Sequence, residues 1–292
     1  MNNFTYSVPT KIHFGKGQIS HLYELSESGN KVLLCYGGGS IKKAGIYDEA
    51  VKILKEEDIE IFELSGIAPN PKIESVREGV KLCKENDIDM VLAIGGGSVI
   101  DCAKVVAAGA CYDGDPWDLV ITPRWIKKAL PIYSVLTLSA TGSEMDPFAV
   151  ISDMSKNEKW GTSSEHMKPK MSILDPEYTY SVSKKQTAAG TADMISHICE
   201  NYFTNVKNAD VQARFAEGLL KNCFKYGPIA LEEPDNYDAR ANLMWTASMA
   251  INGILSDGAE VSWCVHPMEH ELSAFYDITH GEGLAILRSE ER

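Results

Sequence analysis

Five side chains in the C-terminal part of the chain have the types and spacing of a metal site. Asp193 and His197 lie four residues apart on a predicted helix, so both project from one face about one turn apart. Alone, such a pair is equally typical of an exposed hydrogen bond. His266, His270 and His280 form a second block in the same region, so four of the seven histidines gather there, which favours a metal site.

The spacing of the second block constrains the local structure. In one straight helix, the fourteen residues from His266 to His280 would span about 21 Å. That is too far for two ligands of one ion with bonds of about 2 Å. We therefore expect the helix to break within residues 276–279. His266 and His270 are one turn apart, so spacing leaves open which of them binds the metal and which carries protons.

Two identical glycine-rich tetrapeptides indicate a nucleotide site. Each follows a predicted strand, and the second leads directly into a helix. Glycine lets backbone N–H groups approach phosphate oxygens, and a helix N-terminus favours an anion. One such loop alone is as typical of a plain turn. Neither loop fits the G-x-G-x-x-G pattern, because Lys42 and Ile100 stand at the third glycine position. The loop residues assigned to the cofactor are Gly37, Gly38, Gly39, Ser40, Gly95, Gly96, Gly97 and Ser98.

The first loop also indicates which nicotinamide nucleotide binds. It has no Asp or Glu to accept a ribose 2′-hydroxyl, and Ser40, Lys42 and Lys43 offer a hydroxyl and two cations instead. We therefore predict NADP(H) in preference to NAD(H), the alternative being that the two lysines are a solvated helix start. A hydroxyl-rich segment after a later strand is predicted as a second wall of the nucleotide site, the alternative being an ordinary turn. The residues assigned there are Thr137, Ser139, Thr141 and Ser143.

The rhythm of apolar residues predicts the elements that position these side chains. Short apolar runs alternate with amphipathic stretches, which is typical of βαβ units around a parallel sheet. The predicted strands are Val32–Tyr36, Ile59–Leu64, Met90–Ile94 and Ile132–Thr137, followed by extended pieces at Phe148–Ser152 and Met171–Leu174, and the predicted helices between them are Ile46–Glu57, Ile73–Asn86 and Val99–Ala110.

Beyond Ser183 the pattern is helical throughout. The predicted helices are Ser183–Phe203, Ala209–Tyr226, Asp238–Leu255 and Ser262–Asp277, with breaks at Gly227–Pro228 and Ser256–Gly258. We thus predict an α/β nucleotide domain over residues 1–181 and a helical metal-binding domain over residues 182–292. The chain ends soon after what reads as a new helix at His280, so we expect the second domain to be shortened.

Composition excludes several classes of function. The formal charge of −13, from 28 basic and 41 acidic residues, makes nucleic acid and anionic membranes poor partners. No apolar run approaches the roughly 20 residues of a membrane span, and the start lacks a secretory signal, so we expect a cytoplasmic protein. The seven cysteines contain no C-x-x-C pair, so they indicate neither a disulfide framework nor a zinc cage.

Taken together, the motifs resemble those of the iron-containing, group III alcohol dehydrogenases, particularly their NADPH-dependent butanol dehydrogenase or aldehyde reductase branch. The resemblance covers essentially the whole chain. It implies a Rossmann-like domain followed by an all-helical domain, in the architecture of dehydroquinate synthase. The matching motifs are Phe14–Gly17, Gly95–Lys104, Thr141–Met145, and His266–His270 through to Gly283.

The resemblance also implies roles for individual residues. Asp193, His197, His266 and His280 would bind Fe²⁺, with Zn²⁺ as the alternative, and His270 would relay protons. Asp101 is assigned both to catalysis and to cofactor binding, and the cofactor set further includes Lys159. The implied reaction is hydride transfer between NADP(H) and a small aliphatic alcohol or aldehyde, whose oxygen the metal would polarise. The implied assembly is a homodimer.

Two other functions compete with this one. A zinc-dependent polyol dehydrogenase of the glycerol dehydrogenase type resembles the same fold, but it usually has three ligands, and His280 at its motif position disfavours it. The other is a shortened, non-catalytic nucleotide-binding protein, in which missing helices leave the second domain too loose to hold a metal.

Overall fold

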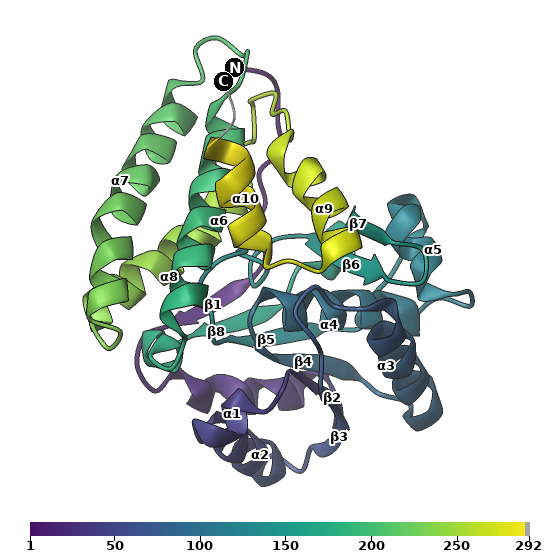
Figure 1. The fold of residues 1–292 in the computed structure, drawn as a ribbon. Helices are drawn as coiled ribbons and strands as arrows, with labels where there is room; N and C mark the ends of the chain where they lie inside the picture. The colour runs from purple at the N-terminus through teal and green to yellow at the C-terminus, as the bar shows by residue number, and fades with distance from the viewer. Residues whose placement is uncertain (290–292) are drawn as a thin grey trace.

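A six-stranded parallel sheet forms the centre of the N-terminal part. The computed structural model describes residues 1–289 (Figure 1). The strand order is β1-β8-β5-β4-β2-β3, and every pairing within this sheet is parallel. The fold class predicted from the βαβ rhythm is therefore confirmed. The strands are β1 (Lys11–Phe14), β2 (Lys31–Tyr36), β3 (Glu60–Leu64), β4 (Met90–Gly95), β5 (Ile132–Leu136) and β8 (Met171–Leu174).

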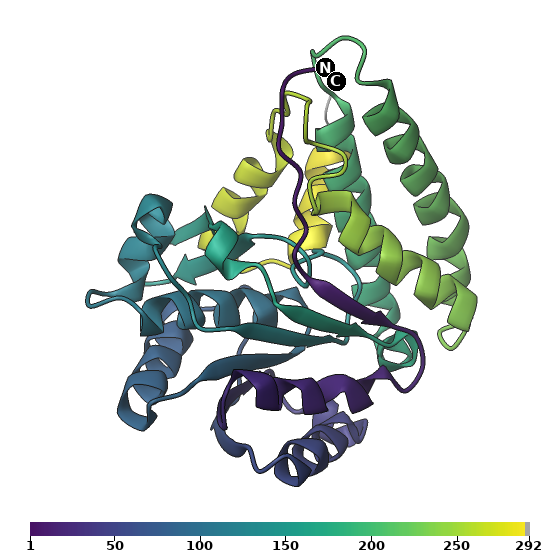
Figure 2. The same cartoon turned by 180° about the vertical axis from the view of Figure 1, so that it is seen from behind.

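Helices cover both faces of this sheet, which explains why its inner strands β2, β4 and β5 are mostly apolar (Figures 1 and 2). Side chains alternate between the faces, so Val32 and Leu34 join one buried cluster while Leu33 and Cys35 join the other. The first face packs against the 3-10 helix η1 (Gln18–Ser28) and α2 (Ile46–Glu56), and the second against α3 (Ile73–Asn86), α4 (Gly97–Ala110) and α5 (Pro116–Ile121).

An antiparallel hairpin separates the sheet from the helical part. Its strands are β6 (Phe148–Asp153) and β7 (Glu158–Ser163), and it lies between α4 and α9 (Figure 1). The extended piece predicted at Phe148–Ser152 is the first of these two strands. The remaining short elements are α1 (Ser40–Lys43), η2 (Pro123–Trp125), η3 (Glu165–Met167) and η4 (Pro176–Thr179).

The C-terminal part of the described chain is helical, as predicted. The helices are α6 (Lys184–Tyr202), α7 (Asp210–Glu232), α8 (Tyr237–Ile251), α9 (Val265–Tyr276) and α10 (His280–Ser289). A third apolar cluster holds α6, α7 and α8 together. The division at residue 181 falls between η4 and α6, and it stays a prediction.

Two helix ends differ from the sequence prediction. The break predicted at Gly227–Pro228 is wrong, because α7 runs through both residues to Glu232. A side chain at Gly227 would come within 2.9 Å of Thr191, so close packing on α6 holds the helix together although proline removes one backbone donor. The third predicted helix ends earlier than expected, at Ile251.

The N-terminal strand β1 and the 3-10 helix η1 were not predicted. Neither has the length or apolar density of the later elements, since β1 has only four residues and none of them is fully buried. Among residues 1–289, no helix is both long and apolar enough to cross a membrane.

Candidate metal centre and nucleotide cleft

Three helices bring the predicted metal ligands together. Asp193 lies on α6, His266 on α9 and His280 on α10. The Asp193 Oδ1 atom is 3.6 Å from His266 Nε2 and 3.8 Å from His280 Nε2. The ligand atoms of these three residues all lie within 4.8 Å of one another. Three of the four predicted ligands therefore converge on one point.

His197, the fourth predicted ligand, lies at the edge of this group. Its Nδ1 atom is 3.6 Å from Asp193 Oδ1, but it is not part of the group of three. Its ring stacks on that of His266, with 4.5 Å between centroids. His197 therefore contacts the cluster on the same face of α6 as Asp193, as the four-residue spacing predicted.

A glycine in the C-terminal motif explains how His280 reaches Asp193. The first residue of α10 is His280, and the next is Gly281. A β-carbon on Gly281 would come within 2.0 Å of the backbone oxygen of Ala189 on α6. Only glycine lets α10 approach α6 this closely, so the motif serves helix packing as well as chemistry.

Unsatisfied buried atoms show that these residues fit a metal ion. Asp193 Oδ1, His197 Nδ1 and His266 Nε2 are buried and have no hydrogen-bond partner. A buried polar atom without a partner costs about 1–3 kcal/mol, and three such atoms in one cluster are unusual. A divalent cation within the group of three would satisfy Asp193 Oδ1 and His266 Nε2, with His197 Nδ1 beside it at 3.6 Å from Asp193 Oδ1. An imidazole and carboxylate set suits iron or zinc.

Two glutamates that the sequence analysis did not single out hold the outer nitrogens of the histidine rings. Glu200 on α6 accepts a hydrogen bond from His266 Nδ1, and Glu269 on α9 accepts one from His280 Nδ1. Both carboxyls have a pKa of about 2, because the paired histidines outweigh burial. They are therefore ionised acceptors, which fixes Nδ1 as the donor and leaves Nε2 free to bind a metal.

The electrostatics of the cluster follow from burial and from these pairs. Burial opposes ionisation of Asp193, yet its pKa lies well below its usual range, because His197 and then His266 favour the charged carboxylate. Burial lowers the pKa of His197 to about 4, so this ring is neutral near pH 7. Burial also acts against charge on His266, but the nearby carboxylates of Asp193 and Glu200 raise its pKa to about 9, so without a metal its Nε2 carries a proton that a bound cation would replace.

The chain breaks between α9 and α10, as the ligand spacing required. Helix α9 ends at Tyr276, and Asp277 has a left-handed φ of 49°. The prediction of a break within residues 276–279 is confirmed. The turn is fastened to the sheet side of the molecule, since Asp277 accepts hydrogen bonds from Lys72 Nζ at 2.7 Å and from Asn70 Nδ2 at 3.0 Å. Asn70 also donates to the backbone oxygen of Ile278 at 3.1 Å.

His270 lies next to the cluster. Its ring centroid is 5.6 Å from that of His280, and it lines the same cavity as His266 and His280. Burial, followed by the charge of Lys159, lowers the pKa of His270 to about 3. A neutral imidazole has one donor and one acceptor nitrogen, so this ring can pass a proton on but does not store one.

Lys159 lies on β7 beside the metal group. Its Nζ atom is 3.1 Å from Glu269 Oε2, 3.1 Å from Asn70 Oδ1 and 3.4 Å from His280 Nδ1. Burial lowers the pKa of this lysine, against the effect of Glu269. The residue assigned to the cofactor from the sequence thus faces the metal end of the cleft.

The second glycine loop leads into the buried helix α4, which carries Asp101. One carboxylate oxygen of Asp101 accepts a hydrogen bond from Ser143 Oγ at 2.6 Å, and the other accepts one from the Val150 backbone N–H at 2.9 Å. Burial raises the pKa of Asp101 to about 6. This carboxylate therefore ties the helix after the loop to the hydroxyl-rich segment and to β6.

Two cavities meet at the second glycine loop. One is open to solvent, has a volume of about 1220 Å³ including its open part, and is lined by Ser98, Asp101, Thr141 and Ser143 together with the histidines of the metal group. The other, of about 730 Å³, is lined by residues of both loops and of the hydroxyl-rich segment: Gly37, Ser40, Gly95, Gly96 and Thr137. Ser139 lines neither of them, and instead faces a small neighbouring pocket. The two cavities together reach from the first loop to the metal group.

The lysines of the first loop differ from each other. Both lie in the short helix α1 and are exposed. The Lys42 Nζ atom is 4.2 Å from the Tyr47 ring centroid and 3.7 Å from Glu63 Oε2. Within residues 1–289, the Lys43 ammonium makes no hydrogen bond or ion pair. Of the two cations, Lys43 is thus the one available to a phosphate.

Their spacing in the sequence could have identified both glutamates as partners of the histidine ligands. Glu200 follows Asp193 by seven residues and His197 by three, so all three share one helix face. Glu269 stands between His266 and His270. Carboxylates next to candidate histidine ligands are typical outer partners of a metal site, and that rule would have found them. Asn70 and Trp263, which also line the large cavity, had no such signal.

Comparisons with known proteins agree on one family. A family model described as iron-containing alcohol dehydrogenase matches residues 9–176, and one described as the C-terminal part of the Fe-containing alcohol dehydrogenase family matches residues 187–290. An NADH-dependent butanol dehydrogenase A of Clostridium acetobutylicum is 60% identical over 98% of this chain and 74% of its own length. An NADPH-dependent aldehyde reductase of Escherichia coli is 44% identical over the same shares.

Solved structures agree with the sequence comparisons. The crystal structure of an NADH-dependent butanol dehydrogenase A from Thermotoga maritima superposes with a TM-score of 0.95 and is 48% identical, covering 97% of this chain and 72% of that one. The Escherichia coli aldehyde reductase also has a crystal structure with a TM-score of 0.95, at 43% identity, covering 98% of this chain and 74% of that one.

Proposed function

The chain belongs to the family of iron-containing alcohol dehydrogenases, and we propose that it reduces small aliphatic aldehydes of about the length of butanal, using NADPH. The family makes it an alcohol and aldehyde oxidoreductase that uses iron and a nicotinamide cofactor. Chain length, cofactor preference and site residues are our proposal.

One observation carries this proposal. Asp193, His197 and His266 carry buried atoms without partners, and the two histidines line a cavity that is also lined by Ser98 and Thr141, next to the glycine loop. A metal and a nicotinamide ring placed there would lie within reach of one substrate. Hydride transfer needs this arrangement, because it depends on a near-attack geometry between nicotinamide C4 and the carbonyl carbon.

Each residue then has a defined part. Asp193, His197, His266 and His280 would hold the metal, which as a Lewis acid polarises the substrate oxygen. Glu200 and Glu269 keep the histidine rings oriented, through the bonds to their outer nitrogens. The two glycine loops and Thr137 hold the phosphates and ribose of the nucleotide.

Two further residues of the cavity have parts of their own. Asp101 positions Ser143 at the wall of the cleft. His270 passes a proton toward the product alkoxide. A His270→Ala enzyme whose pH–rate profile matched that of the unaltered protein would remove the relay from this scheme.

The test is metal-supplemented reduction of butanal, followed as loss of NADPH absorbance. The unaltered chain should turn over, and His280→Ala should lose both turnover and the metal ion held by Asp193 and His266. His166→Ala is the matched control, because His166 is exposed and lies outside the cavity. Absence of turnover from folded, metal-loaded protein would favour the reading of a silent nucleotide-binding protein.

The preference for NADPH rests on the first loop. It has no carboxylate, and the exposed Lys43 can pair with a 2′-phosphate. One relative is named NADH-dependent and another NADPH-dependent, so the names alone do not decide which cofactor this chain prefers. We expect kcat/KM to be higher with NADPH than with NADH. Lys43→Ala should reduce the ratio of the NADPH value to the NADH value several-fold. Lys52→Ala, an exposed lysine on α2, is the control. An equal or higher kcat/KM with NADH would overturn the preference.

The proposal extends to assembly, compartment and domains. We propose a cytoplasmic homodimer with a domain boundary near residue 181. The edge strand β1 supports the dimer, since within residues 1–289 only its β8 side is paired. Sedimentation equilibrium at micromolar concentration tests the dimer, and a mass equal to one chain would exclude it.

A further inference from the structure

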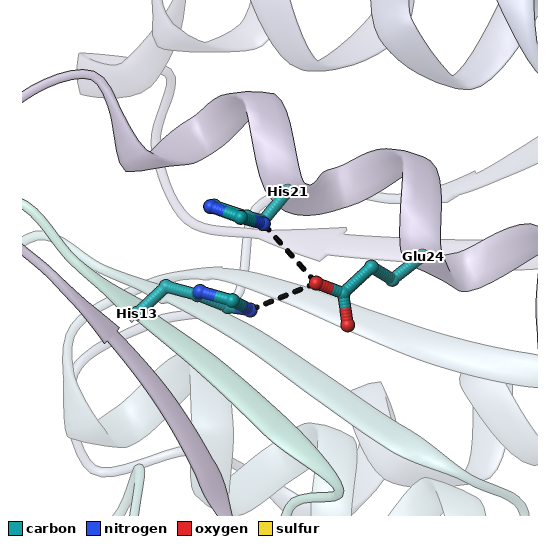
Figure 3. A group of neighbouring side chains, drawn as sticks. All are labelled: His13, His21 and Glu24. Carbon is teal, nitrogen blue, oxygen red and sulfur yellow. Dashed lines mark hydrogen bonds and ion pairs between the residues drawn. The ribbon is translucent and has the colours of Figure 1, made fainter.

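Three side chains at the opposite end of the molecule from the metal group form a second compact cluster of metal-binding groups. His13 lies on the edge strand β1, and His21 and Glu24 lie on η1 (Figure 3). The ligand atoms of these three residues all lie within 4.8 Å of one another. We propose that they form a second metal site, which binds Zn²⁺.

Distances within the cluster match the size of a tetrahedral site. Glu24 Oε1 is 3.0 Å from His13 Nε2 and 3.1 Å from His21 Nδ1, as the dashed lines of Figure 3 indicate. Neighbouring ligand atoms around a tetrahedral zinc with bonds of about 2.0–2.1 Å are about 3.3 Å apart. The carboxylate oxygen thus already lies at nearly the required separation from both nitrogens.

An unsatisfied atom supports a cation in this place. His13 Nε2 is buried and has no hydrogen-bond partner, although a carboxylate oxygen is only 3.0 Å away, because the direction between them does not suit a hydrogen bond. Burial, followed by the neighbouring His21, lowers the pKa of His13, so its ring is neutral near pH 7. His13 Nε2 therefore lacks a partner, and a cation among the three ligand atoms would supply one.

The surroundings resemble those of a built site. Lys11 Nζ is 2.7 Å from the other carboxylate oxygen of Glu24, which fixes the orientation of the carboxylate as an outer partner does. Lys11 is the cation in contact with the cluster, and its side chain is 58% exposed, so it can turn toward solvent when a metal binds. Tyr23 contributes a ring 5.8 Å from that of His21.

Binding requires one local change. The two imidazole rings are stacked with centroids 3.6 Å apart and only 10° between their planes, so their nitrogen lone pairs run side by side. One ring must tilt for both lone pairs to meet at a single ion. The His21 ring can do so, because its side chain is 30% exposed. Water would occupy the fourth position, as in zinc sites with three protein ligands.

Zinc suits this donor set better than magnesium, calcium or ferrous iron does. Two imidazoles and one carboxylate form a known zinc ligand combination, whereas magnesium and calcium prefer oxygen ligands throughout. Among divalent metals, zinc also ranks above iron in affinity for such a site. The bound ion would link β1 to η1, and so fasten the edge of the sheet to the helix that covers it.

The test counts zinc ions on the full chain. Protein stripped with a chelator is equilibrated with Zn²⁺, freed of excess metal, and examined by native mass spectrometry. We expect two ions per chain for the unaltered protein and for His166→Ala, an exposed histidine in neither cluster. We expect one ion for His21→Ala and one for His13→Gln, with butanal reduction by the iron-loaded enzyme unchanged within twofold in both.

A second set of variants separates this site from the first. His280→Ala should keep one ion, and His280→Ala combined with His21→Ala should keep none. Circular dichroism confirms that each variant is folded. A single ion on the unaltered protein that disappears in His280→Ala would overturn the proposal, and so would two ions that both remain in His21→Ala. Neither result depends on enzyme activity, so failure here leaves the proposed function untouched.

Discussion

The two copies of the Gly-Gly-Gly-Ser tetrapeptide have the same sequence but meet opposite structural demands. The first opens the four-residue helix α1, and a β-carbon on Gly38 or Gly39 would have no neighbour within 4 Å. The second opens the buried helix α4, and a β-carbon on Gly97 would lie 2.3 Å from Thr141 Oγ1. Packing therefore requires glycine in the second copy, whereas in the first copy only Gly37 lies close to another atom, with its β-carbon position 3.2 Å from the Ile67 backbone oxygen.

The helices that follow differ in the same way. Helix α1 carries the exposed Lys42 and Lys43, whereas α4 carries Asp101 and Lys104 inside the protein. Lys104 is fully buried, and its Nζ atom is 2.8 Å from Asp146 Oδ1. The second loop is thus part of the rigid framework, while the first is free to adapt to its ligand. One sequence motif does not imply one structural role.

Gly97→Ala should have the largest effect, because its new methyl group collides with a stiff, β-branched side chain. We expect a loss of about 3 kcal/mol in the free energy of unfolding, together with a KM for nucleotide raised at least tenfold. Denaturant unfolding and steady-state kinetics measure the two. Retention of both within twofold would show that the second loop is not packed as tightly as its contacts indicate.

Asp101→Asn should remove a pH dependence of the free energy of unfolding that arises in the helix after the second loop and not next to the first loop. Burial raises the pKa of Asp101 to about 6, so the folded state holds this proton more tightly than the unfolded state. The free energy of unfolding should then fall as pH rises from about 4 to about 6. This contribution is on the order of 2 to 3 kcal/mol and should be absent in the variant.

For Asp101→Asn, the quantity to compare with the unaltered protein is the slope of the free energy of unfolding against pH. Denaturant titration at several pH values measures it. Glu144, whose pKa burial raises to about 7, leaves a residual slope of the same sign in both proteins. Identical slopes for the two proteins would mean that Asp101 is as easily ionised when folded as when unfolded.

Gly39→Ala should have a smaller effect, through backbone conformation alone. Gly39 has a φ of 94°, in the region that disfavours other residues, but no atom lies near its missing β-carbon. We expect a loss of about 1 kcal/mol in the free energy of unfolding. An unchanged unfolding midpoint would show that the first loop adopts another conformation at no cost.

Gly38→Ala should have the least effect on stability, within about 0.5 kcal/mol, because there is open space at its β-carbon. Its effect on nucleotide affinity is a separate measurement, made by fluorescence titration with NADPH. Weaker affinity at unchanged stability would indicate that the backbone of the first loop touches the phosphates. A large loss of stability would contradict the difference between the two loops.

Sequence reasoning predicted the sheet, the helices and the region of the metal group, because each rests on a local pattern. Strands β2, β4 and β5 are mostly apolar, and helix α3 matches its predicted bounds at both ends. The break before His280 followed from a distance that no straight helix could satisfy.

What sequence reasoning missed depends on contacts between distant segments. The position of Lys159 beside Glu269 is set by the hairpin packing on α9, and no periodicity contains that information. The proximity of His13 to His21 requires a short edge strand to pair with β8 above η1. Pro228 read as a helix end because proline usually ends helices, and packing of α7 on α6 overrode that rule.

The fastening of the turn between α9 and α10 to the sheet side has a thermodynamic consequence. Asn70 and Lys72 hold Asp277, three residues before His280, so the segment that borders the cleft also sets where one metal ligand lies. A nucleotide that orders this segment would therefore increase the affinity for the metal. Such coupling is reciprocal, so the metal must increase the affinity for the nucleotide by the same factor.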